Sequence, residues 1–419
     1  MARPHPIDAL ILPLTWVARA RGRRRLLLLT GYAVILGTVG ALVGREAILW
    51  KLPDAPEPFD LARYDHVELA DADNAMIPYR RAVAAIAPGT PRNGGLQGVL
   101  TPAMIEPNRA ALDLWLRGTG RPDALLDQPG EPPAAGRWAL LNDLATLGQL
   151  ALLDATRRQT AGDLAGAWTL DGAVIRTGLH VGRHARSDSG GYGVRAIREA
   201  ALHATAWADD PRTTADLLRR ALADLAACRA LESSAIDTAR VDYLGARADL
   251  LDPEVRRGWQ PSRLRNQDWE NHLPGVTWAH NFLWNEPKRS LKVLRLVAAG
   301  QFAQADRPIA DRSPMFDPDY LIFQVDASTP PLLARIKPAD LAAWVRASYA
   351  LVPLSHIAAF QGQARATRQT LDLLRLHLAQ RAYTLEHAGS APSRFGDLLG
   401  PYLDALPEGF APSDSLVAP

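Results

Sequence analysis

The feature that most constrains this chain is an uncharged run that directly follows a cluster of arginines. Five arginines lie between Arg19 and Arg25, and the nineteen residues from Leu26 to Gly44 carry no charge. At about 1.5 Å per residue, a helix needs roughly 20 apolar residues to cross the hydrocarbon core of a bilayer. The run therefore predicts a transmembrane helix over residues 26–50 that contacts membrane lipid, with Trp50 at the far interface.

A retained anchor and a cleaved signal peptide are the two interpretations of this segment. A cleavable signal has an apolar core of about 7–15 residues and a small-x-small cleavage site. The run here is longer, no A-x-A site follows it, and the preceding segment 1–25 is long for a signal n-region. We therefore expect a retained signal anchor, with the cleaved signal as the alternative.

The charges that flank the run predict its orientation. Residues 1–25 carry six arginines and one aspartate, whereas Arg45 and Lys51 are mixed with acidic residues. Because positive residues stay on the cytoplasmic side, we expect a single-pass protein with a basic cytoplasmic tail (1–25) and an exported main domain.

The composition argues against a nucleic-acid partner and excludes an intramolecular disulfide. The formal charge is +2, but residues 1–25 contribute +5, which leaves −3 for the rest of the chain. The main domain therefore lacks the basic stripe that nucleic acid requires. The single cysteine, Cys228, cannot form an intramolecular disulfide, and its helical surroundings predict a small core residue.

Beyond a Pro-rich linker at 51–62, apolar residues recur with helical spacing, and no alternating run indicates a strand. The pattern predicts an all-α domain over 63–370 made of stacked antiparallel hairpins, TPR-like or irregular, and a distinct C-terminal part over 371–419. The segment SDSGGYG, 187–193, is expected to interrupt the helices. The expected helices are 71–87, 101–118, 138–160, 164–184, 194–208, 212–232 and 234–250.

Two local resemblances support this architecture. GDLAGAWTLDGAVI, 162–175, resembles a tetratricopeptide-type hairpin, with Gly162 at the turn and Ala167 where two helices touch, although no 34-residue period is present. The tail 371–407 is similar to the segment that follows the long helix in type II secretion pseudopilins, but it lacks their Asp-Pro-aromatic continuation and prepilin cleavage site. The matching tail positions are Tyr383, His387, Gly389, Pro392, Leu398, Tyr402, Leu403 and Pro407.

The whole layout resembles an uncharacterised family of bacterial single-pass membrane-anchored helical proteins. The elements of that layout are the basic flank and anchor, DADNAMIPYRRA, PADLAAWV and the tail. The resemblance implies this architecture. With the flanking charges, we expect a bacterial cytoplasmic-membrane protein with its N-terminus in the cytoplasm and its main domain periplasmic or otherwise extracytoplasmic. The resemblance implies no activity.

His180 and His184 are the one candidate pair for a metal site. They are spaced i, i+4 on one helical face, and His203 or Asp171 could add a third ligand. However, Val181 stands where a metalloprotease motif has glutamate, and nearby arginines repel a cation. We therefore expect no metal and no cofactor.

The segment 259–289 is the candidate ligand site, because tryptophans alternate there with histidines and asparagines. Flat aromatic faces beside amides suit a polar ligand such as a glycan or peptide, but they also suit a lipid interface or a packing lid over the helices. The candidate ligand-binding residues are Trp269, His272, Trp278, His280, Asn281 and Trp284.

No complete reactive constellation is present, so no catalytic residue is assigned. The sequence favours a membrane-anchored exported scaffold or binding protein without enzymatic activity, which would meet protein partners on its helical faces. One alternative is an envelope hydrolase with its site near 259–289 or on the His180/His184 face. The tail resemblance implies a further alternative, an accessory protein of a secretion or pilus-like machine.

Overall fold

The computed structural model describes residues 21–51, 56–92, 99–252 except 133 and 135, seven residues between 291 and 302, and 357–415 except 408. Within these ranges the chain forms α-helices and short 3-10 helices and no β-strand. The all-α prediction is therefore confirmed.

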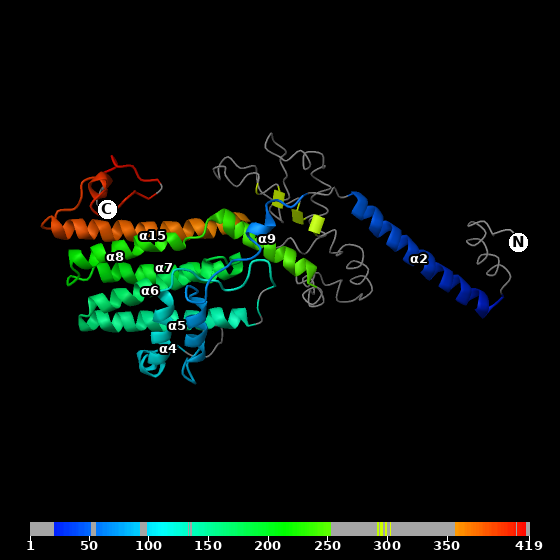
Figure 1. The fold of residues 1–419 in the computed structure, drawn as a ribbon, viewed down its shortest axis with the longest axis horizontal. Helices are drawn as coiled ribbons and strands as arrows, with labels where there is room; N and C mark the ends of the chain where they lie inside the picture. Colours follow the sequence, from blue (N-terminus) through cyan, green and yellow to red (C-terminus); the bar gives the residue numbers. More distant parts are fainter. Residues whose placement is uncertain are drawn as a thin grey trace.

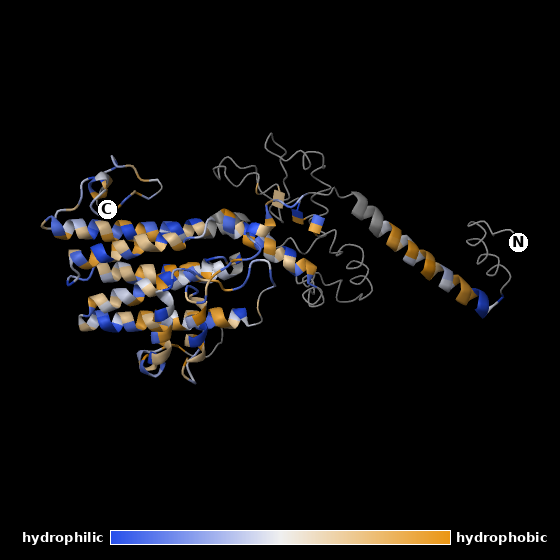
Figure 2. Ribbon diagram, viewed as in Figure 1, coloured by the Kyte–Doolittle hydropathy of each residue, from blue (hydrophilic) through white to orange (hydrophobic). Residues whose placement is uncertain are grey.

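The N-terminal helix α2 (Arg23–Lys51) contains the apolar run. Its Arg23–Gly44 part, 22 residues, is long and apolar enough to cross a membrane and is not buried within the protein. Hydrophobic residues run along it in Figure 2. The hydroxyls of Thr30 and Thr38 donate to the carbonyls of Leu26 and Val34, at 3.0 and 2.8 Å, so these polar groups are satisfied inside the helix as a bilayer requires.

The main body is a stack of long helices, α5 (Arg137–Ala161), α6 (Leu164–Gly182), α7 (Ser187–Ala208), α8 (Ala215–Cys228) and α15 (Ile357–Glu386), which lie side by side in Figure 1. The helix α6 packs against both α5 and α7, and α15 packs against α7 and α8. The turn between α5 and α6 was predicted correctly: Gly162 ends α5 at φ +88°, and the Asp163 carboxylate accepts the Gly166 N–H at 2.9 Å.

The predicted break at 187–193 is wrong, because these residues form the first turns of α7. Their glycines allow a close helix crossing instead of a loop. A Cβ on Gly193 would lie 2.3 Å from the carbonyl oxygen of Gly178 on α6, so only glycine fits at this contact. The intrinsic cost of glycine in a helix is offset by the α6–α7 packing that it permits.

Two shorter helices, α3 (Met76–Ala84) and α4 (Arg109–Thr119), pack on each other and contact α5 and α6. The expected single helix over 101–118 is instead divided into η2 (Pro102–Met104), η3 (Glu106–Asn108) and α4. Pro102 is the first residue of η2 and Pro107 the second residue of η3, and neither has an N–H to continue an α-helix. Gly118 does not stop α4 but lies buried against the Tyr79 ring.

The described segment that follows α2 is docked on the body. The Glu57 carboxylate accepts hydrogen bonds from the Tyr243 hydroxyl on α9 (Ala235–Leu251) and from the Arg295 guanidinium, whose Nη2 lies at 2.5 Å. Phe59 makes edge-to-face contacts with Tyr64 and Tyr243. The described part of the 51–62 linker thus continues directly into packed structure, beside η1 (Leu61–Arg63).

The C-terminal tail belongs to the same hydrophobic core as the long helices. Leu398 in η10 (Phe395–Leu398) and Leu403 are buried in a cluster that also contains residues of α5 to α8 and α15. The Glu386 carboxylate at the end of α15 accepts hydrogen bonds from the Tyr402 hydroxyl at 2.5 Å and from Arg219 of α8 at 2.6 Å. These contacts fix the tail on α15 and α8.

Candidate functional site

The candidate site is a groove between α5 and α7, with α6 as its floor. We call it the α5–α7 groove. It encloses a cavity of about 390 Å³, within the size range of small-molecule sites. The floor residues Val174, Gly178 and Val181 recur at helical spacing along one face of α6. The residues that line the cavity are Leu141, Asn142, Leu144, Ala145, Gly148, Gln149, Val174, Thr177, Gly178, Val181, Gly191, Tyr192, Gly193, Arg195, Ala196 and Glu199.

Glycines on all three helices shape the groove. Gly178 and Gly193 bring α6 and α7 together, while Gly148 on α5 leaves open space above the floor. A Cβ on Gly148 would meet only Val174, at an ordinary contact distance of 3.8 Å. The missing side chain at Gly148 therefore enlarges the cavity without being required by the packing.

Hydrogen bonds cross the groove from α5 to α7 at two places. The Tyr192 hydroxyl donates to the Asn142 side-chain oxygen at 3.1 Å. Farther along the same helices, the Thr156 hydroxyl oxygen lies 2.9 Å from Nε2 of His203, and Nδ1 of His203 lies 2.9 Å from the Asp171 carboxylate on α6. We call the second arrangement the Thr156–His203–Asp171 clasp. The cavity lies along α5 and α7 between these two hydrogen-bonded contacts.

The Thr156–His203–Asp171 clasp has the order of groups found in hydrolase triads, but its proton arrangement suits a structural role. The Thr156 hydroxyl donates its one proton to the Leu152 carbonyl at 3.0 Å, so Nε2 of His203 donates to the hydroxyl oxygen. The hydrogen bond to Asp171 raises the pKa of His203, while burial raises the pKa of Asp171. A ring nitrogen that donates its proton to the hydroxyl oxygen cannot act as a general base for that hydroxyl.

The clasp also lacks donors for a developing oxyanion. Thr156, Asp171 and His203 all lie inside long helices, where backbone N–H groups are already bonded to carbonyls of the preceding turn. The geometry therefore holds α5, α6 and α7 together and does not assemble an acyl-transfer site.

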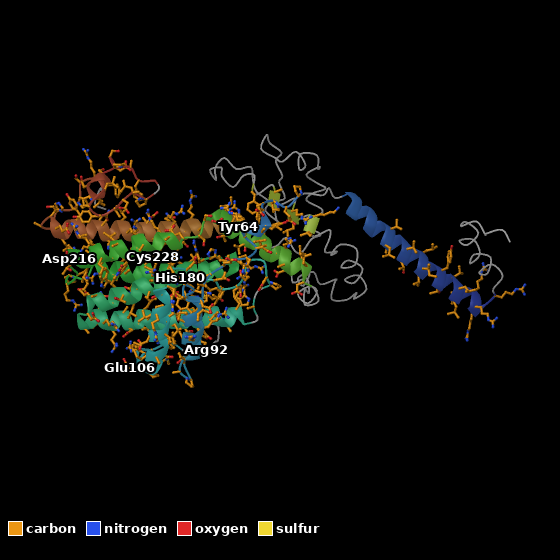
Figure 3. The ribbon with its side chains drawn as sticks, in the orientation of Figure 1. Tyr64, Arg92, Glu106, His180, Asp216 and Cys228 are labelled. Carbon is orange, nitrogen blue, oxygen red and sulfur yellow. The ribbon has the colours of Figure 1, made fainter. Side chains whose placement is uncertain are left out.

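The structure gives His180 and His184 separate partners and does not bring them together as ligands. Nδ1 of His180 lies 2.9 Å from the Tyr79 hydroxyl, which also contacts the Thr177 hydroxyl at 3.2 Å. Burial, aided by the Arg176 charge, lowers the pKa of His180 to about 4. The labelled His180 lies inside the helical body in Figure 3.

His184 instead faces Asp123, with its Nε2 at 3.3 Å from the carboxylate, and takes a left-handed backbone conformation at φ +50°. Partial burial raises the pKa of Asp123, but hydrogen bonds from His184 and from the Ala124 N–H lower it to about 2 overall. Across the described ranges, no group of three histidine, cysteine or acidic residues is placed to hold a metal ion.

A second cavity of about 400 Å³ is lined in part by Tyr64. Tyr64 lies at the α9 end of the body in Figure 3. Its lining includes Arg63, His66, Arg183 and His184. Two of these groups, Arg183 and His184, are already bound to Asp123. The α5–α7 groove is therefore the better candidate, because most of its lining is apolar and its one ion pair, Arg195–Glu199, is exposed.

The other candidates from the sequence have mixed outcomes. The six residues proposed to bind a ligand, Trp269, His272, Trp278, His280, Asn281 and Trp284, lie outside the described residues. Cys228 is a buried core residue, as predicted, and burial raises the pKa of its thiol to about 11. The α5–α7 groove itself was missed, because its lining comes from three helices and no single stretch of sequence contains it.

Comparisons of the chain with protein-family models, with curated proteins and with solved structures found no match.

Proposed function

We propose that this is a single-pass membrane-anchored protein whose helical body is exported across the bacterial cytoplasmic membrane and binds a ligand in the α5–α7 groove. The observation that carries the proposal is the cavity of about 390 Å³ between two cross-groove hydrogen bonds. The apolar helix α2 and the arginine cluster support the anchoring and the orientation.

Binding without catalysis fits the groups around the groove. Its lining offers two amides (Asn142 and Gln149), a phenol, a hydroxyl and one ion pair, and the remaining lining residues are apolar. His203, one turn beyond Glu199 on α7, is held by Asp171 and Thr156. The alternative of an envelope hydrolase gains no support from the His180/His184 face, since both imidazoles are committed to structural partners.

Site-specific photocrosslinking in cells tests the binding function. A photoreactive phenylalanine derivative replaces Gln149 or Glu199 in the full-length protein, and the same residue replaces the exposed Ala223 on α8 as a matched control. We expect covalent adducts, of a small molecule or of a partner protein, from the two groove positions and not from position 223. A groove without adducts, or equal adducts at position 223, would contradict the proposal.

A further inference from the structure

The shape of the α5–α7 groove restricts the kind of ligand that it can take. Its walls run from Leu141 to Gln149 on α5 and from Gly191 to Glu199 on α7, which is about 12 Å along each helix. The cavity is thus elongated along α6 and small for a ligand site, near the low end of the usual range of about 300–1,000 Å³. These dimensions suit a single slender chain that lies parallel to α6.

The inner surface of the groove is apolar. Leu141, Leu144 and Ala145 form the α5 wall, and Val174 and Val181 form the floor. Each methylene that such a surface removes from water contributes about 0.8 kcal/mol, or roughly a fourfold change in affinity. An alkyl chain gains this contribution at each carbon, whereas a polar chain would lose hydrogen bonds to water.

The two walls carry complementary polar groups near one end of the cavity. Arg195 on α7 makes an ion pair with Glu199 at 2.8 Å, and the two side chains are 66% and 36% exposed. Such exposed i, i+4 pairs contribute little to stability, so a ligand carboxylate can replace Glu199. Across the groove, the Gln149 amide has no hydrogen-bond partner in the part of the chain that the structure describes, and it can donate to the same carboxylate.

The rim offers one cationic group to an anionic ligand, the Arg195 guanidinium. Arg198 is exposed on the same helix but lies outside the cavity lining, so Arg195 is the group that a ligand anion would meet. A guanidinium also binds a carboxylate through two parallel hydrogen bonds, which a single ammonium group cannot do.

From these features we infer that the α5–α7 groove binds a medium-chain monocarboxylate of the fatty-acid class. Its chain lies along α6, and its carboxylate meets Arg195 and Gln149. The inference rests on the proposed binding function and names the ligand of the same site. Tethering by α2 would keep the groove within reach of the bilayer, where such amphiphiles partition.

Photolabelling of the full-length protein in lipid nanodiscs tests the inference. The probe is decanoic acid that carries a diazirine on its chain, and labelled peptides are mapped by mass spectrometry. We expect label in 141–149, 174–181 and 191–199. Unlabelled competitors should act in the order dodecanoate, decanoate, octanoate, with about a fourfold step for each methylene that the cavity accommodates, and decanol and decylamine should compete less well than decanoate.

Two groove variants and two controls make the test specific. Arg195→Gln should weaken decanoate competition by about tenfold or more, because it removes a charged hydrogen bond, and Gly148→Leu should abolish labelling by filling the cavity. The control variants Arg220→Gln and Ala223→Leu, at exposed α8 positions, should label as the wild type does. A folding defect is excluded with Gly148→Ala, which should raise the melting temperature yet reduce labelling.

The outcomes separate this inference from the proposed function. Label spread equally over α8 peptides, or stronger competition by decylamine than by decanoate, would overturn the carboxylate inference. If the groove positions form adducts in cells but decanoic acid does not label them, the binding function stands and the ligand class is wrong. If neither experiment labels the groove, both proposals fail.

Discussion

His180 is a neutral imidazole inside the helical body, and its titration couples folding to pH. Its side chain is fully buried beside Tyr79 and Arg176, and its pKa is lowered from 6.5 to about 4. The folded state therefore binds fewer protons than the unfolded state between these pH values. Stability is fully present above about pH 6.5 and falls as the pH drops toward 4, by roughly 3 kcal/mol in total.

The variant His180→Gln should remove this dependence, because an amide does not titrate. We expect the free energy of unfolding of wild type to decrease between pH 6.5 and pH 4 by more than that of the variant. Urea denaturation of the full-length protein, followed by tryptophan fluorescence, measures both. His66→Gln, at an exposed imidazole, serves as the matched control. A variant whose pH profile overlays that of the wild type would show that the pKa of His180 is the same in the folded and unfolded states.

At the scale of helices, the α6–α7 crossing depends on two glycines that meet face to face. A Cβ on Gly178 would lie 2.7 Å from the Gly193 carbonyl oxygen, whereas a Cβ on Gly172 of the same helix would meet only Trp168, at 3.9 Å. We expect Gly178→Ala to destabilise the protein by about 1–3 kcal/mol, since the helices must separate. Gly172→Ala should leave stability unchanged or raise it by up to about 1 kcal/mol. Thermal unfolding of the two variants measures both changes in stability. Equal changes in stability for Gly178→Ala and Gly172→Ala would argue against a close α6–α7 crossing.

The same crossing shows what the sequence could and could not predict. The α5–α6 hairpin was predictable, because Gly162 and Asp163 carry local signals for a helix end and a helix start. The start of α7 was not predictable, because three glycines within four residues are typical of a loop. Only the contact with Gly178 on α6 shows why a helix has glycine there. The groove was missed for the same reason: its shape depends on packing between residues far apart in sequence.

At the scale of the whole molecule, the C-terminal tail completes the core. Leu398 is fully buried in the cluster that includes the long helices. Leu398→Ala should lower the free energy of unfolding by about 2–5 kcal/mol, whereas Leu385→Ala, at a 37% exposed position on α15, should have a much smaller effect. Denaturant unfolding of the full-length variants measures the difference. A separate C-terminal part, as the predicted division at residue 371 implies, predicts instead that Leu398→Ala leaves the helical body unchanged.

Membrane topology determines which compartment the α5–α7 groove faces. The arginine cluster at Arg19–Arg25 precedes the apolar helix α2, so the body should follow on the extracytoplasmic side. Protease added to intact spheroplasts should digest the helical body and leave a small membrane-bound fragment that carries an N-terminal tag. A cytoplasmic marker protein should survive the same treatment. Survival of the body until lysis would reverse the orientation, and an N-terminal tag missing from the membrane fraction before proteolysis would indicate a cleaved signal instead of an anchor.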